Sequence, residues 1–96
     1  MQYLVLIHSN PTKQSTNEEW ESFFTIANKS GSFKGGSEVG NKIRYGNIDT
    51  KSSIDHINGY MRFDVNKLSE LHEILENLPI IINGGTVDIC ELPESE

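Results

Sequence analysis

The stretch INGYMRFDV, at residues 57–65, decides the fold together with MQYLVLIH, at residues 1–8. Residues 57–65 alternate apolar or small side chains with polar ones, as a strand with one buried face does. Residues 3–8 instead place apolar side chains on both faces of a strand. A strand that is apolar on both faces is covered on both, so the sheet that contains residues 3–8 needs a cover on each side.

An amphipathic helix is expected after each of these strands. The first runs from Asn17 to a C-cap at Gly31 and is preceded by two overlapping capping boxes, Ser15 with Glu18 and Thr16 with Glu19. Its apolar stripe is Trp20, Phe23, Phe24 and Ala27. The second spans residues 67–77, with Asn66 as N-cap and Pro79 as its stop. Its stripe is Leu68, Leu71, Leu75 and Leu78. We expect the core between helices and sheet to contain Phe23, Phe24, Leu71 and Leu75.

Two further strands complete the pattern. Residues 42–45 alternate two apolar with two basic side chains, and residues 87–92 form the last strand, whereas residues 30–41 are expected to be a loop or a short irregular strand. The order strand–helix–strands–helix–strand predicts one α+β domain over residues 1–96, a ferredoxin-like split βαβ sandwich with both helices on one face. We expect a second copy to cover the other face, which gives a homodimer of the dimeric α/β-barrel type.

Composition limits the classes of partner. Fourteen acidic against eight basic residues give a net charge of −6, and no run of Lys and Arg is present, so nucleic acid is not an expected partner. No apolar run is long enough to span a bilayer. The single cysteine, Cys90, excludes an internal disulfide and fits a reducing compartment. The N-terminus lacks the pattern of a signal peptide. We expect a cytoplasmic protein that contacts no membrane.

The candidate catalytic residues are His8, His56 and Asp55. A histidine exchanges protons near neutral pH, and a neighbouring carboxylate can orient it as a general base. Antiparallel pairing of the first strand with residues 57–65 would place His8 beside residues 55–57. The first helix begins at the same end, where its free N–H groups suit an anion. We therefore expect a small-molecule pocket lined by His8 and residues 55–60.

The candidate ligand-binding residues are Arg44, Tyr60 and Arg62. An arginine on a sheet face can hold a carboxylate or phosphate through two hydrogen bonds. The alternative is an ion pair with an acid such as Asp64 or Asp88. The three histidines show no metal-ligand spacing along the chain, and neither pair of adjacent glycines belongs to a phosphate-binding motif. The sequence thus predicts no metal site and no cofactor.

Several stretches of the chain resemble the YciI-related family, and most closely its DGPF branch. They are MQYLVLIHSN at the start, NEEWESFFTIANKSG, GYMRFDV with the following LSELHEILENLP, and GGTVDICELPE near the end. The resemblance implies a ferredoxin-like fold, dimers formed through the sheets, and a cleft near the dimer interface proposed as an active site. The Asp-Gly-Pro-Phe motif is missing from DTKSSIDHINGY. The family's dyad of a helix histidine and an aspartate before a proline is also missing, because Trp20 and Leu78 stand near those positions.

Two functions are compatible with these features. The first is a YciI-related homodimer that binds a small anionic or aromatic molecule, or a protein partner, at an interface cleft. The second is a small cofactor-free enzyme, similar to a lyase or isomerase, with His8 or His56 as the general base. Convergence of both histidines and an arginine on one pocket would favour the enzyme, and their dispersal would count against it.

Overall fold

A computed structural model describes residues 1–51 and 53–94 of the chain. Its elements are β1 (Gln2–His8), α1 (Asn17–Ser30), β2 (Phe33–Glu38), β3 (Ile57–Asp64), α2 (Leu68–Leu75), α3 (Pro79–Ile82) and β4 (Val87–Leu92). The order and the packing are those of the ferredoxin-like α+β fold, which confirms the prediction. No helix of the described part has the length and apolar character that crossing a membrane requires.

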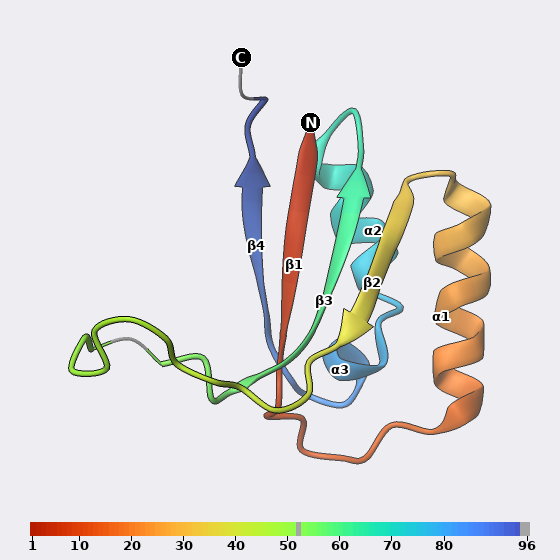
Figure 1. Cartoon of the computed structure of the whole chain (residues 1–96). Coiled ribbons are helices and arrows are strands. Elements are labelled where there is room, and N and C mark those ends of the chain that lie inside the picture. The colour runs from red at the N-terminus through yellow and green to blue at the C-terminus, as the bar shows by residue number, and fades with distance from the viewer. Residues whose placement is uncertain (52, 95–96) are drawn as a thin grey trace.

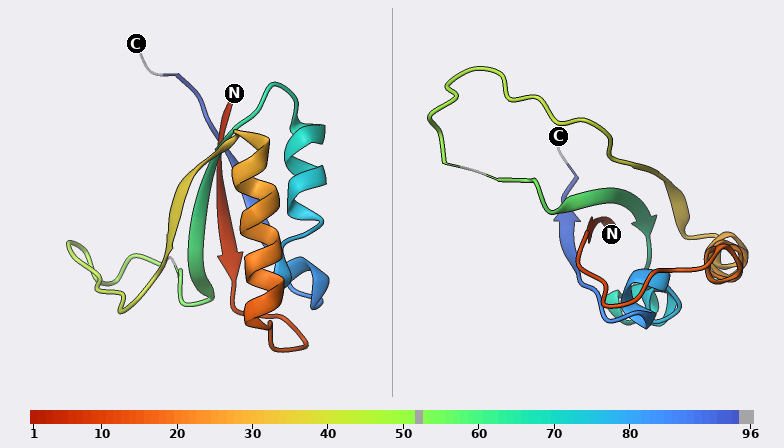
Figure 2. Two further views of the ribbon diagram at one scale, coloured as in Figure 1. Left: turned by 90° about the vertical axis from the view of Figure 1, so that its right-hand side faces the viewer. Right: turned by 90° about the horizontal axis from the view of Figure 1, so that it is seen from below.

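The four strands form one sheet in the order β2-β3-β1-β4, and every neighbouring pair is antiparallel. The helices all lie against one face of this sheet, as Figures 1 and 2 show. β1 and β3 occupy the centre, and His8 pairs with Ile57 after a shift in register. The sequence-based expectation that the end of β1 lies beside the start of β3 is therefore confirmed.

The second strand is not where the sequence predicts it. The prediction places it at residues 42–45, but these lie in a long connection, whereas β2 spans Phe33–Glu38 in the stretch predicted to be loose. The physical reason is competition for one edge. β2 pairs with β3 along Glu38 to Phe33 and so occupies the free edge of β3. Residues 42–45 then have no strand beside them to supply hydrogen bonds.

The core lies between the helices and the sheet. Phe23, Phe63 and Leu71 are fully buried. Leu75 and Leu78 belong to the same buried set, as the helix stripes predict. Three members of the stripes do not: Phe24 and Leu68 keep 37% and 41% of their surface exposed, and Trp20 is only partly buried. Phe24 sits near the outer strand β2, where the sheet ends and leaves a hollow.

The start of α1 is fixed by one of the two predicted capping boxes. Thr16 Oγ1 accepts a hydrogen bond from Glu19 N at 3.1 Å, and Glu19 Oε1 accepts one from Thr16 N at 2.9 Å. Two hydrogen bonds lower the pKa of Glu19 below its ordinary value. The bond from the Thr16 backbone has the larger effect, and the bond from the Asn83 side chain comes second. Gly31 ends the helix with φ 74°, a left-handed conformation that glycine adopts without strain.

Replacing Thr16 with alanine is expected to lower the free energy of unfolding by about 1 kcal/mol, since one N–H of the first turn loses its partner. Urea denaturation followed by circular dichroism measures this loss. Ser22→Ala is the matched control, because Ser22 is an exposed residue of α1 outside the capping box. An equal loss in both variants would contradict this account of the helix start.

Candidate functional site

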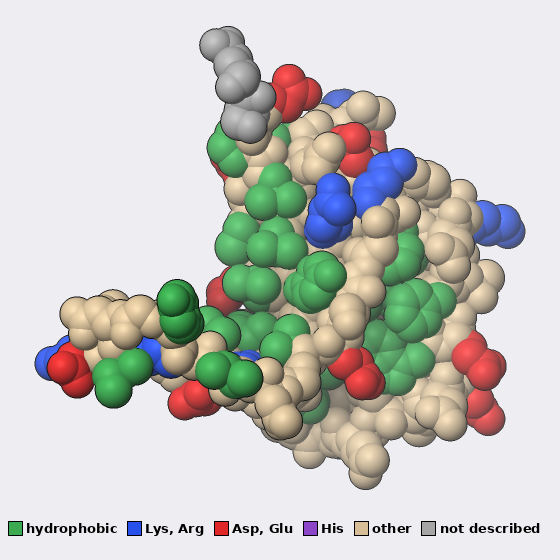
Figure 3. Space-filling view, in the orientation of Figure 1, with side chains coloured by type: hydrophobic (Ala, Val, Ile, Leu, Met, Phe, Trp, Pro, Cys, Tyr) green, Lys and Arg blue, Asp and Glu red, His purple; other side chains and the backbone are tan. Residues whose placement is uncertain are grey.

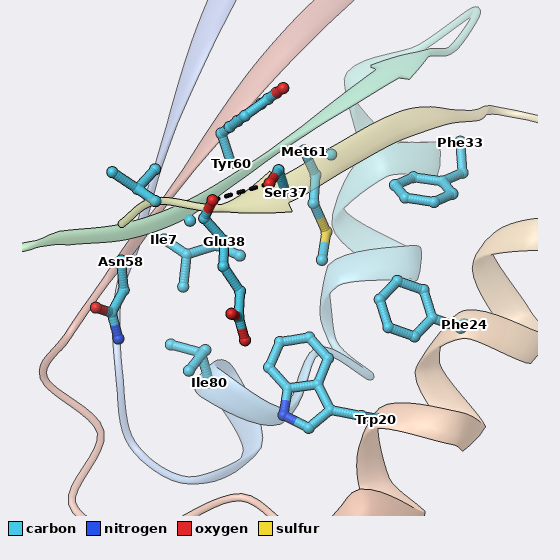
Figure 4. Close-up of a pocket in the computed structure, with 13 residues that line it drawn as sticks. Ile7, Trp20, Phe24, Phe33, Ser37, Glu38, Asn58, Tyr60, Met61 and Ile80 are labelled. Carbon is cyan, nitrogen blue, oxygen red and sulfur yellow. Dashed lines mark hydrogen bonds between the residues drawn. The ribbon is translucent and has the colours of Figure 1, made fainter. Parts of the chain in front are cut away.

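A pocket of about 520 Å³ opens between α1 and the β2–β3 edge of the sheet. Its apolar wall consists of aromatic side chains from α1 and β2 together with Ile7, Met61 and Ile80 (Figure 4). Trp20 and Phe24 stack at 5.8 Å with 27° between their planes, and Phe24 lies 6.0 Å from Phe33. These side chains present aromatic faces and edges next to a cavity, which suits a flat apolar ligand.

The polar side of the pocket comes from the ends of β2 and β3. Ser37, Glu38, Asn58 and Tyr60 are its polar lining residues, and Glu38 carries the one formal charge among the described lining residues. The Tyr60 ring itself is directed away from Trp20 and Phe24, toward the other face of the sheet. Figure 4 shows the Glu38 side chain directed into the space in front of Trp20 and Ile80. Gly36 lets β2 approach closely at this edge, because a Cβ there would collide with the Tyr60 carbonyl oxygen. The pocket therefore offers acceptors and a negative charge.

A second group of functional side chains gathers where β1 ends. His8 Nε2 lies 2.8 Å from Asp88 Oδ2, at the start of β4. The ring of His56, in the connection before β3, lies 4.7 Å from the ring of His8 in an edge-to-face arrangement. Backbone bonds hold these segments together, since Ser9 N donates to the His56 carbonyl at 2.8 Å and His8 N to the Thr86 carbonyl at 3.1 Å.

The structure thus brings together some of the predicted site residues and separates others. His8 and His56 meet, as the topology predicts, but Asp88 supplies the carboxylate and Asp55 does not take part in the cluster. Asp55 instead accepts a long contact, 3.5 Å, from Lys42 through its backbone carbonyl. Of the predicted pocket segment, residues 58–60 do line the pocket, whereas neither histidine does.

Neither arginine joins the histidines. Arg44, predicted on a strand, lies in the connection between β2 and β3, where its Nη1 donates to the Thr50 carbonyl at 2.8 Å and the Ile48 carbonyl at 3.4 Å. Arg62 lies toward the opposite end of β3 and reaches Gln2 Oε1 at 3.4 Å. Tyr60, the third predicted ligand-binding residue, is 37% exposed and lies at the rim of the pocket.

Asp88 is a candidate site residue that the sequence analysis did not place in the site, although the strand order allowed it. In a ferredoxin-like sheet β4 is antiparallel to β1, so the start of β4 must lie beside the end of β1. The observed register pairs Leu6 with Asp88, which places Asp88 on the same face as His8, two residues further along. The sequence gives only a weak indication of the aromatic pocket. The stripe of α1 contains three large aromatic residues, and the buried core includes just Phe23 among them.

Comparison with known proteins shows the fold alone. The sequence matches no protein-family model and no curated protein. Among solved structures, the chain resembles 5-chloro-2-hydroxyhydroquinone dehydrochlorinase from Burkholderia phenoliruptrix, solved in complex with 2,5-dihydroxybenzoquinone. The TM-score is 0.59 at 10% sequence identity, over 99% of this chain and 96% of the other. That neighbour is an enzyme, and it binds a small molecule.

Proposed function

We propose that this chain is a cytoplasmic, YciI-related homodimer that binds a small planar aromatic molecule in the pocket beside α1. The observation that carries the proposal is the arrangement of Trp20, Phe24 and Phe33 around a 520 Å³ cavity that contains one carboxylate. Aromatic residues in a close-packed core normally contact one another without leaving a space of this size. The cavity has the size of a small-molecule site.

The charge of the pocket selects among ligands. A carboxylate at the pocket repels an anion and accepts hydrogen bonds from hydroxyl or amine groups. Glu38 therefore favours a phenol, a hydroquinone or an aromatic amine over the anionic ligand that the sequence suggested. The compound in the structure of the neighbour, 2,5-dihydroxybenzoquinone, is likewise a small planar ring.

Binding is expected to change the fluorescence of Trp20, which is the only tryptophan of the chain and lines the pocket. Titration with hydroquinone, catechol and aniline should alter the emission with a saturating curve, and benzoate should not. Glu38→Gln should remove the discrimination against benzoate. Glu21→Gln is the matched control, because Glu21 is an exposed acid of α1 outside the pocket. An emission that no compound changes would refute the proposal.

A homodimer is supported by the face of the sheet that the helices leave open. This open face carries Leu4, Leu6, Tyr60, Cys90 and Leu92, according to the register of β1 with its neighbours. Figure 3 shows these apolar side chains gathered over β4, β1 and β3. An apolar patch of this kind, bordered by Arg62 and by His8 with Asp88, is typical of an interaction site. A second copy of the same face would bury it symmetrically.

The connection between β2 and β3 supports the same assembly. We call residues 39–51 and 53–56 the arm, which projects from the lower end of the sheet toward the open side (Figure 2). The arm exposes Ile43 by 90%, Tyr45 by 100%, Ile48 by 69% and Ile54 by 57%. Long connections with apolar tips usually have a function. A second subunit on the open face would give these side chains a surface to cover.

The alternative is a cofactor-free enzyme with His8 as the general base. The 2.8 Å contact between His8 Nε2 and Asp88 Oδ2 favours it, since a carboxylate holds an imidazole in a fixed orientation. Against it, the described lining of the pocket contains neither arginine and neither of these histidines. The two functions separate by experiment, because His8→Gln would abolish catalysis while leaving the Trp20 titration unchanged.

A further inference from the structure

We propose that His8, His56 and Asp88 form a binding site for a divalent transition-metal ion, with Zn²⁺ as the best match. Each residue offers one ligand atom, and these three atoms all lie within 4.8 Å of one another. The three come from separate segments of the chain, the end of β1, the connection before β3 and the start of β4. The spacing of histidines along the sequence therefore did not predict the site, and only the fold assembles it.

The distances agree with a site that closes around an ion. Ligand atoms bound to tetrahedral zinc lie about 2.0–2.1 Å from the metal, hence roughly 3.3 Å from one another. His8 Nε2 and Asp88 Oδ2 are already nearer than this, at 2.8 Å, and an ion between them would replace their direct contact. The ligand atom of His56 must approach the other two by about 1.5 Å to reach the spacing of a tetrahedral site. Its side chain is exposed, so rotation about its side-chain bonds can supply that movement.

The donor types select the metal. Two imidazoles and one carboxylate suit Zn²⁺, Fe²⁺, Ni²⁺ or Cu²⁺, whereas Mg²⁺ and Ca²⁺ require sites made of oxygen ligands. Three protein ligands leave at least one position for water or another molecule, which is the pattern of catalytic rather than structural zinc sites. The net charge of −6 adds a general attraction for cations.

The backbone holds two of the ligands in place before any ion binds. His8 N donates to the Thr86 carbonyl, two residues before Asp88, and this bond fixes β1 against the start of β4. Ser9 N donates to the carbonyl of His56, which fixes the connection before β3 against the same end of β1. A site supported in this way loses little conformational entropy on binding.

The test is a titration of the full-length, chelator-treated protein with ZnCl₂ in competition with a chromophoric chelator. Wild type is expected to bind one Zn²⁺ per chain. His56→Gln and Asp88→Asn should each weaken binding by at least about tenfold, since even loss of a supporting residue around a metal costs about 10–100-fold. The matched control is His72→Gln, which removes the remaining histidine, an exposed residue of α2 outside the cluster, and should leave affinity unchanged.

A second readout does not depend on the variants. Co²⁺ should give the intense visible absorption of a four-coordinate site in wild type and in His72→Gln, and MgCl₂ in excess should not displace it. Circular dichroism verifies that each variant is folded. Three results would overturn the proposal. Wild type and the cluster variants could bind zinc with equal affinity, or the stoichiometry could fall in His72→Gln alone. Wild type could also fail to compete with the chelator for zinc. Because the aromatic pocket does not include these residues, loss of the metal site would leave the Trp20 titration intact.

Discussion

Replacing Phe23 with alanine is expected to lower the free energy of unfolding by about 3–5 kcal/mol, because the side chain is large and fully buried. Phe23 belongs to the core cluster, between helix α1 and the sheet. Its removal would leave a cavity in the middle of a small core. A domain of this size has only a small margin of stability, so the variant should be partly unfolded at room temperature. Urea denaturation of both proteins measures the difference.

Phe24→Ala is the matched control for this substitution. The two residues are neighbours in sequence, have the same side chain and lie on the same predicted stripe, but Phe24 retains 37% of its surface exposed. We expect the control to lose about half as much stability, since Phe24 removes less area from water and its truncation leaves no closed cavity in the core. Equal losses would mean that Phe24 belongs to the core and that the pocket beside it is closed in solution.

The contrast between these two phenylalanines shows how far the sequence predicts this fold. Helical periodicity identifies which residues face the sheet, because that depends only on 3.6 residues per turn. It does not reveal where the sheet ends beneath the helix. β2 is an edge strand with few large side chains, so the helix residues above it are only partly covered. The hollow that makes the candidate pocket follows from that edge.

The same limit explains the misplaced second strand. The sequence FKGGSE in β2 lacks the alternation typical of a strand, and its two glycines favour a loop. Residues 42–45 show good alternation, but alternation is only a local preference. Pairing with β3 decides the outcome, since a strand without a neighbour leaves its hydrogen-bonding groups unpaired. Topology, by contrast, correctly predicts that His8 and His56 meet, because the direction of neighbouring strands requires it.

The place of Asp88 in the cluster with His8 and His56 is only partly predictable in this way. The argument that joins β1 to β3 applies equally to β1 and β4, and it places Asp88 near His8. What the sequence does not contain is the register. A shift of one residue would turn Asp88 to the opposite face of β4. The observed pairing of Leu6 with Asp88 is therefore what makes the cluster.

Replacing Leu6 with aspartate is expected to convert the proposed dimer into a monomer at micromolar concentration. Leu6 lies in the middle of the open face, between Tyr60 of β3 and Asp88 of β4 in the register of the sheet. A symmetric interface would bury this position in both subunits, so the substitution places two unpaired carboxylates in one apolar contact, each beside Asp88. Burying a charge without a partner costs several kcal/mol. That cost exceeds what one small interface of about 1,000 Å² can readily offset.

Light scattering and sedimentation velocity on wild type and variant measure this effect. Ile26→Asp is the matched control, because Ile26 is 38% exposed on α1 and lies away from the open face. The control should remain dimeric, and the folded content of the Leu6 variant should persist by circular dichroism. Loss of dimers would also expose the apolar arm, so the Leu6 variant should bind a hydrophobic dye more strongly than wild type. A wild-type protein that is monomeric at micromolar concentration, or a Leu6 variant that stays dimeric, would show that the open face is not the interface.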